Sequence, residues 1–202
     1  MMAGPGMPAA AAQSIKLVAL GDSLTAGLGL PVQDAFPAKL ARALQAKGFG
    51  VDVVNAGVSG DTASDGLNRV DWSVPNGTDA VIVEFGANDA LRGVDPKITR
   101  KALDGILTKL QSRGIPVLLA GMEAPRNLGP DYFHAFDSIY PDLASAHGVL
   151  LYPFFLDGVA TEARLNQGDG IHPTAAGVDI IVDRMLPKVE ELLAQARSKN
   201  RS

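Results

Sequence analysis

The sequence of 202 residues contains no cysteine and no long apolar run, and each absence excludes a class of chemistry or of protein. Without cysteine there are no disulfide bonds, thiolate nucleophiles or cysteine metal sites, and redox chemistry gives no indication of the compartment. A transmembrane helix needs about 18 consecutive apolar residues, and no segment reaches that length. Stable insertion into a membrane is therefore not expected.

A strong charge of one sign is also missing. The formal net charge is −4, and the lysines and arginines are scattered, with no basic run longer than two residues. Such a chain lacks the basic surface that binds nucleic acid or anionic membranes, so neither partner is expected. Hydrophobic residues make up 47% and charged residues 20%, which is the balance of a globular protein with one core.

Residues 1–14, MMAGPGMPAAAAQS, show neither a strand nor a helix period. They are interpreted as a disordered leader or as the remnant of a signal peptide, because Ala10, Ala11 and Ala12 resemble a cleavage site. A basic start and a long apolar stretch are both missing, so a functional signal peptide is not present as written. The remaining residues, 15–202, are predicted to form one domain.

Short apolar runs alternate with amphipathic segments throughout that domain. Strands are predicted over residues 15–20, 51–54, 80–85, 116–120 and 149–151. Helices are predicted over residues 34–48, from residue 62 past residue 70, and over residues 95–114, 132–146 and 174–195. Asp34, the Thr62–Asp65 pair and Asp95 are the expected caps, Pro141 is the expected break and Pro187 a possible bend. This alternation predicts a parallel sheet with helices on both faces.

Polar, glycine-rich segments follow four of the predicted strands. They are residues 21–24, 55–62, 86–89 and 169–173. The carboxyl ends of parallel strands meet at one edge of a sheet, and ligands bind outside that edge. We therefore expect these four segments to form the functional site.

Ser23, Asp169 and His172 are the candidate catalytic residues. A serine is a poor nucleophile unless a base removes its proton, and His172 is the candidate base. Asp169 precedes His172 by three residues, a spacing that allows a carboxylate to fix the tautomer of the ring. The other histidines, His134 and His147, are interpreted as ordinary surface or packing residues.

Acyl transfer also needs hydrogen-bond donors for the developing oxyanion. The candidates are the backbone N–H groups of Ser23 and Gly60 and the side-chain amide of Asn88. Taken alone, Gly60 and Asn88 are better explained as turn residues. Asp22 either helps to hold the nucleophile turn or acts as a local helix cap.

These four segments together resemble the SGNH, or GDSL, hydrolase family. Residues 21–24 match its GDSL block, Gly60 its glycine block, residues 86–89 its G-x-N-D block and residues 169–172 its D-x-x-H block, all in order. The likeness spans residue 16 to about residue 190. Within the family the chain is most similar to the bacterial arylesterase and acyl-CoA thioesterase I/lysophospholipase L1 branch, through NAGVSGDT, GANDALRG and YPFFLDGV.

The resemblance implies an α/β fold, a flavodoxin-like three-layer α/β/α sandwich with a five-stranded parallel sheet. It also implies a metal-free mechanism without a cofactor, in which Ser23, Asp169 and His172 form the triad and Ser23, Gly60 and Asn88 the oxyanion hole. Many members of this branch are exported, so a periplasmic or secreted location is expected, with a cytoplasmic one as the alternative.

The expected substrates are small acyl esters, and also acyl thioesters. Leu24, Phe154, Phe155 and Ile171 are candidates for an acyl groove, although the two phenylalanines are equally suited to the core. No long lid is evident, so short to medium acyl chains and aryl leaving groups are expected, with acyl transfer to alcohols as a side activity.

Other functions are less well supported by the sequence. A carbohydrate O-deacetylase would use the same triad, but Trp72 is the only tryptophan that could stack on a sugar. A flavodoxin-like binding module would need a phosphate-binding loop, and GDSLTAG does not match one. A zinc hydrolase is disfavoured because no two histidines have ligand spacing. Nothing marks an interface, so the oligomeric state stays open.

Overall fold

The computed structural model describes residues 14–199, so the expected leader lies outside the described residues except for Ser14. The expected periplasmic or secreted location stays a prediction. Within the described range, no helix is both long enough and apolar enough to cross a membrane.

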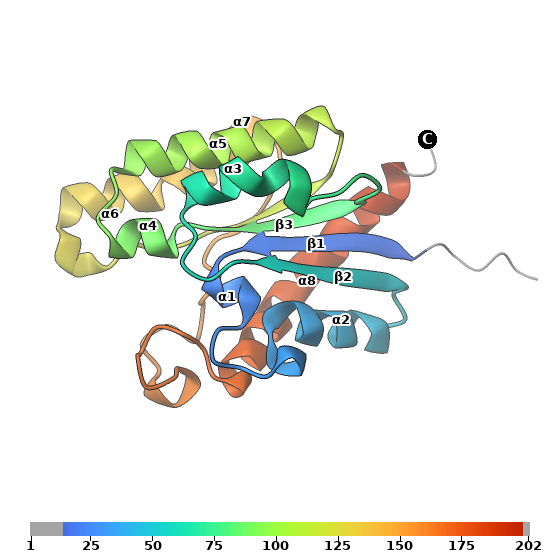
Figure 1. The fold of residues 1–202 in the computed structure, drawn as a ribbon, viewed down its shortest axis with the longest axis horizontal. Helices are drawn as coiled ribbons and strands as arrows, with labels where there is room; N and C mark the ends of the chain where they lie inside the picture. Colours follow the sequence, from blue (N-terminus) through green and yellow to red (C-terminus); the bar gives the residue numbers. More distant parts are fainter. Residues whose placement is uncertain (1–13, 200–202) are drawn as a thin grey trace, which may run out of the picture.

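Five strands form one sheet, and all of its pairings are parallel (Figure 1). The strands are β1 (Ile15–Gly21), β2 (Val51–Gly57), β3 (Ala80–Glu84), β4 (Val117–Ala120) and β5 (Leu150–Tyr152), in the spatial order β2-β1-β3-β4-β5. β3 and β4 are buried along their whole length, whereas the edge strands β2 and β5 are partly exposed. This burial explains the continuous apolar runs of the central strands, which are covered on both faces.

Helices cover both faces of the sheet and make three layers (Figure 1). One layer contains α3 (Ala63–Ser73), α5 (Pro96–Ser112) and α7 (Ile139–His147), and the other contains α2 (Phe36–Ala46) and α8 (Ala175–Lys199). The short helices α1 (Ser23–Ala26), α4 (Ala87–Leu91) and α6 (Pro130–Asp137) follow strand ends or connections. The expected α/β/α sandwich with a five-stranded parallel sheet is confirmed.

Two of the expected helix starts have the predicted caps. Thr62 and Asp65 form a reciprocal capping box at the start of α3. Asp95 accepts a hydrogen bond from the N–H of Lys97 at the start of α5, with Pro96 at the first helical position. Each such cap satisfies backbone donors that the first turn of a helix leaves free.

Other boundaries differ from the prediction. Asp34 lies in a 3₁₀ turn (Val32–Asp34) and does not cap α2, which begins at Phe36, with Pro37 in its first turn. Proline lacks an N–H and fits only where no intrahelical bond is needed. The same reason moves the break between α6 and α7 to Ser138, because Pro141 occupies the first turn of α7. α8 continues through Pro187.

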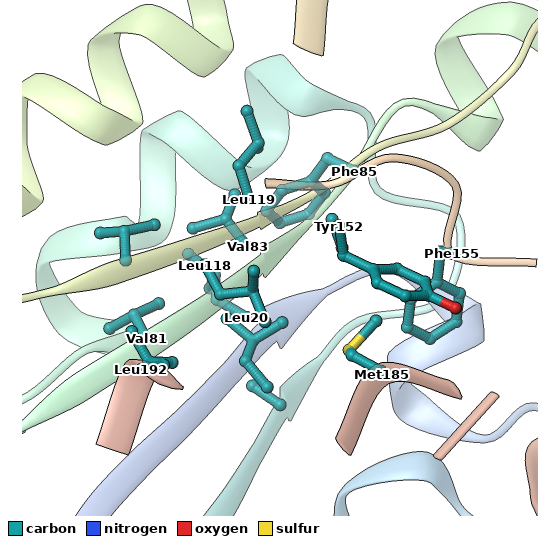
Figure 2. Packing of buried hydrophobic residues seen from close by; sticks show 14 of the residues in the cluster. Leu20, Val81, Val83, Phe85, Leu118, Leu119, Tyr152, Phe155, Met185 and Leu192 are labelled. Carbon is teal, nitrogen blue, oxygen red and sulfur yellow. The ribbon is translucent and has the colours of Figure 1, made fainter. Parts of the chain in front are cut away.

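The core lies between the sheet and the two helical layers. Leu20, Val81 and Leu118 come from three neighbouring strands and are fully buried, as are Met185 and Leu192 of α8 (Figure 2). This packing fixes the sheet rigidly. Its carboxyl edge therefore provides a stable base for the four polar loops.

Candidate active site

The structure brings Ser23, His172 and Asp169 together in one hydrogen-bonded chain. The Nε2 atom of His172 lies 2.9 Å from the Oγ atom of Ser23. The Nδ1 atom of His172 lies 2.7 Å from Oδ2 of Asp169. With the carboxylate accepting from Nδ1–H, Nε2 is left as the basic nitrogen that faces the serine hydroxyl.

Asp169 is held as a carboxylate by donors on its own loop. Its Oδ1 atom accepts hydrogen bonds from the N–H groups of Ile171 (2.9 Å) and His172 (3.0 Å). The hydrogen bond from Ile171, followed by that of the His172 side chain, lowers the pKa of Asp169 well below its usual value. The D-x-x-H spacing thus closes a tight turn that orients the imidazole from two sides.

Ser23, the candidate nucleophile, lies at the start of the four-residue helix α1, which follows β1 directly. Asp22 caps this helix by accepting a hydrogen bond from the N–H of Leu24 (2.9 Å). A side chain on Gly21 would lie 2.2 Å from Oγ1 of Thr25 and 2.6 Å from Oε2 of Glu84. Only glycine fits at position 21. The structure thus explains the residue type at Gly21 by lack of space, at Asp22 by the helix cap and at Ser23 by the contact with His172.

Two of the three oxyanion candidates present free backbone donors. The N–H groups of Ser23 and Gly60 donate to no atom of residues 14–199. Gly60 has a φ of +90°, a conformation that favours glycine, and its carbonyl accepts from the side chain of Arg92 (2.8 Å). Both groups are therefore available to a ligand.

Asn88 is placed differently. It lies in α4, and its amide nitrogen is 3.1 Å from Oδ2 of Asp22 and 3.0 Å from the carbonyl oxygen of Asp61. Both amide hydrogens are thus used in this structure. To donate to an oxyanion, Asn88 has to exchange one of these two acceptors.

Arg69 is a residue of the site that the sequence reasoning missed. From α3, its guanidinium donates to the carbonyls of Gly21 (2.8 Å) and Ala56 (2.9 Å) and to the carboxylate of Asp61 (2.6 Å). It therefore ties the ends of β1 and β2 to the loop that carries Gly60. No signal in the sequence marks Arg69, because an arginine on a helix ordinarily faces solvent and only the structure shows its burial.

Glu84 is a second residue that was missed, although it ends the apolar run AVIVE. Both Glu84 and Asp22 are fully buried below the Ser23 turn. Burial raises the pKa of Asp22 to about 6 and raises the pKa of Glu84 well above its usual value.

An apolar cavity of about 370 Å³ is lined by chain neighbours of the candidate catalytic residues, although Ser23, Asp169 and His172 themselves do not line it. Its walls come from the segments after β3, β4 and β5 and include Ala87, next to Asn88, and Ile171, next to His172. Met122 and Phe154 add further apolar surface, and Arg126 is the basic residue among those that line it. The cavity and the catalytic atoms therefore share two chain segments.

The cavity includes two of the four residues expected for the acyl groove. Phe154 and Ile171 line it, whereas Leu24 and Phe155 do not. Phe155 is fully buried and packs edge-on against Phe36 of α2 with ring centroids 5.1 Å apart, and Leu24 is 4% exposed. Leu24 and Phe155 therefore lie in the core in this structure, which for Phe155 is the alternative to the acyl groove that the sequence also offered.

The remaining histidines do not reach the site. His147 bridges Asp104 and Gln111 and so joins α7 to α5, while His134 lies against the ring of Phe133. Within residues 14–199, no group of three or more His, Cys, Asp or Glu residues could hold a metal ion.

A serine, histidine and aspartate in hydrogen-bonded order, at the carboxyl edge of a parallel sheet covered on both faces, define an α/β hydrolytic enzyme of the triad class. Residues 19–180 match the GDSL-like lipase/acylhydrolase family. The chain belongs to this family, the SGNH hydrolases, and is an SGNH-type enzyme that acts on esters.

Several relatives of this chain are similar over most of its length. Esterase TesA of Pseudomonas aeruginosa is 38% identical over 185 residues, which cover 91% of each chain. The arylesterase of Vibrio mimicus is 39% identical over 83% of this chain and 84% of the relative. Thioesterase 1/protease 1/lysophospholipase L1 of Escherichia coli K12 is 39% identical over 91% of this chain and 87% of the relative.

A solved structure agrees with this assignment. The crystal structure of AlinE4, an SGNH-hydrolase family esterase, superposes with a TM-score of 0.77 at 45% sequence identity. The match covers 91% of this chain and 99% of AlinE4.

Proposed function

We propose that this enzyme hydrolyses carboxylic esters with aryl leaving groups or short to medium acyl chains, and acyl thioesters, through an acyl-enzyme on Ser23. The observation that carries the proposal is the continuous Ser23–His172–Asp169 hydrogen-bond chain beside an apolar cavity. The chain supplies an activated nucleophile, and the cavity offers apolar surface to the acyl group.

In the proposed mechanism, His172 Nε2 accepts the proton of the Ser23 hydroxyl as Oγ attacks the ester carbonyl. Asp169 stays ionised and stabilises the imidazolium that forms. His172 then donates the proton to the leaving alcohol or thiol. A water molecule, deprotonated by the same nitrogen, attacks the acyl-enzyme and releases the acid.

The oxyanion is held by the N–H groups of Ser23 and Gly60 and by the amide of Asn88. The two backbone groups are free to donate. We propose that Asn88 gives up the carbonyl of Asp61 and keeps its bond to Asp22 when the oxyanion forms. Asp22 thus acts both as the cap of α1 and as the acceptor that orients Asn88.

The acyl chain length is limited by the cavity. At about 370 Å³, the cavity is near the small end of the range seen for ligand sites, which supports short to medium chains over long lipids. The names arylesterase and thioesterase 1, carried by relatives at 39% identity, support aryl and thioester leaving groups. Transfer of the acyl group to an alcohol in place of water uses the same intermediate.

The carbohydrate O-deacetylase alternative gains less support. Trp72, the residue best suited to stack on a sugar, is 73% exposed on α3 and does not line the cavity. Within the cavity the aromatic side chain is Phe154, among aliphatic neighbours.

The test is hydrolysis of p-nitrophenyl esters from acetate to palmitate, of the matching acyl-CoA thioesters, and of acetylated sugars. The proposal expects fast cleavage of short and medium aryl esters, a decline toward palmitate, and slow release of acetate from sugars. Faster cleavage of acetylated sugars than of any aryl ester would favour the deacetylase.

A further inference from the structure

Two carboxyl groups lie side by side below the nucleophile turn. Asp22 and Glu84 are both 0% exposed, and the pairing of β1 with β3 places Glu84 opposite Gly21. Oε2 of Glu84 accepts hydrogen bonds from Oγ1 of Thr25 (2.8 Å) and from the N–H of Asp22 (3.3 Å). Glu84 thus binds the turn at two points.

The other oxygen of Glu84 has no such donor. Oε1 is fully buried and has no hydrogen-bond partner among residues 14–199. A buried carboxylate oxygen without a donor is costly, whereas the same atom as part of a neutral acid is not charged. The described part of the molecule therefore offers no stabilisation for a negative charge on this oxygen.

The charged groups around the pair do not neutralise it. No Lys, Arg or His of residues 14–199 forms an ion pair with Asp22 or Glu84. Arg69, the cation on α3, is bonded to Asp61 and to backbone carbonyls. His172, on the loop after β5, lowers the pKa of Asp22 through its electrostatic interaction. The hydroxyl of Tyr140 on α7 donates to the carbonyl of Phe85.

Asp22 and Glu84 are neighbours, because the N–H of Asp22 donates to Oε2 of Glu84 at 3.3 Å. Two adjacent carboxyl groups in a buried site do not readily ionise together. Burial, and after it the charge of Asp22, raises the pKa of Glu84 well above its usual value, in agreement with a proton on Glu84.

We propose that Glu84 carries a proton in the resting enzyme, and that this neutral acid, which accepts from Thr25 and from the N–H of Asp22, is a positioning residue for the catalytic site. Oδ1 of Asp22 accepts from Leu24 and sets the turn that holds Ser23. Oδ2 accepts from Asn88 and orients the proposed oxyanion donor. Through Asp22, Glu84 thus helps to position both the Ser23 turn and the amide of Asn88. Its effect on turnover rests on the proposed function, whereas the location of the proton does not.

The proton is tested by infrared difference spectroscopy on the whole protein at neutral pH. We expect a C=O stretching band of a buried protonated carboxylic acid that shifts in D₂O and disappears in Glu84→Gln. The proposal would be overturned by the absence of any such band, or by a band that survives Glu84→Gln and is lost in Asp22→Asn. This readout does not depend on activity, so it stands even if the proposed substrates are wrong.

The positioning role is tested by comparing two variants of Glu84. Gln has the shape of the neutral acid and can still accept from Thr25 and from the N–H of Asp22, so Glu84→Gln should keep kcat within about threefold. Glu84→Leu removes this acceptor and should lower kcat by about 10- to 100-fold at nearly constant KM. Circular dichroism and thermal unfolding identify variants that do not fold.

The two variants also separate a neutral from an ionised Glu84. A folded Glu84→Gln protein that loses as much turnover as Glu84→Leu would show that the charge at this position is needed and would sink the proposal. Equal and full activity in Glu84→Leu would remove the positioning role. A Ser23→Ala protein that stays active would instead refute the proposed mechanism and leave the infrared result untouched.

Discussion

The imidazole of His172 meets the hydroxyl of Ser23 at 2.9 Å across 149 residues of chain. Ser23 follows the first strand, and His172 lies between the last strand and the last helix. Their meeting depends on the parallel sheet, which brings the loop after every strand to one edge. The fold thus brings together a histidine and a serine from opposite ends of the domain.

Ser23→Ala should abolish ester hydrolysis. Removing the nucleophile prevents the acyl-enzyme, so kcat is expected to fall by about 10⁴- to 10⁶-fold. The measurement is the rate of p-nitrophenyl ester cleavage. Ser112→Ala, at an exposed position on α5, is the matched control and should leave the rate unchanged. More than a tenth of the rate remaining in Ser23→Ala would exclude Ser23 as the nucleophile.

Asp169→Asn should lower kcat on the order of 10⁴-fold while the protein stays folded. The amide oxygen can still accept from the Ile171 and His172 N–H groups, but the amide nitrogen would face Nδ1 and favour the wrong tautomer of His172. The control is Asp157→Asn. Asp157 is an exposed aspartate on the same connection between β5 and α8 as Asp169, and it pairs with Arg184 of α8. Comparable loss in both variants would point to a general effect of charge.

Ser23, Asp169 and His172 could be selected from the sequence because polar residues in glycine-rich loops stand out between apolar strands. The hydrogen bond between Asp169 and His172 follows from a local turn, whereas the one between His172 and Ser23 depends on the sheet. The strand boundaries were harder to predict from the sequence. β2 extends to Gly57 because its end pairs with Gly21 of β1, and that tertiary pairing overrides the polar character of Asn55.

Glu84 and the cavity were not predicted for two different physical reasons. Glu84 lies at the end of an apolar strand, where an acidic residue ordinarily faces solvent. Its burial next to Asp22 is seen only in the structure. Most residues that line the cavity, such as Met122 and Ala90, are apolar. An apolar side chain gives the same sequence pattern whether it faces the core or an empty cavity, which also explains the misplacement of Phe155.

Asn88→Ala should lower kcat by about 10²- to 10³-fold with little change in KM, because an oxyanion donor acts mainly in the transition state. Steady-state kinetics on one aryl ester provides both constants. Asn68→Ala, an exposed position on α3, is the control. A rise in KM at constant kcat would mean that Asn88 binds the ground state and is not part of an oxyanion hole.

The stability of the fold should decrease as the pH rises from about 4 to 7, in part through Asp22. Burial raises the pKa of Asp22 from 3.8 to about 6. A carboxyl whose pKa is raised by folding stabilises the protein fully below its unfolded pKa, and this contribution is lost as the pH rises through the folded pKa. The loss is on the order of 1–3 kcal/mol.

Denaturant unfolding at pH 4, 5.5 and 7 measures this effect. Asp22→Asn should reduce the pH dependence of the unfolding free energy between those values, because asparagine does not titrate, and the remaining slope includes the contribution of Glu84. Asp52→Asn, at an exposed position on the edge strand β2, should keep the slope of the parent protein. An unchanged slope in Asp22→Asn would show that Asp22 does not titrate in this window.

Filling the cavity should shorten the range of acyl chains without affecting the triad. Ala160 lines the cavity and is neither a triad residue nor a proposed oxyanion donor, so Ala160→Phe places a ring in the space proposed for the acyl chain. The expected result is a loss of about tenfold or more in kcat/KM for p-nitrophenyl decanoate, with acetate cleavage unchanged, because each excluded CH₂ forfeits about 0.8 kcal/mol of burial. Ala194→Phe, on the exposed side of α8, is the matched control. A uniform loss on acetate and decanoate would indicate a disturbed triad, and no loss on either would place the acyl chain outside this cavity.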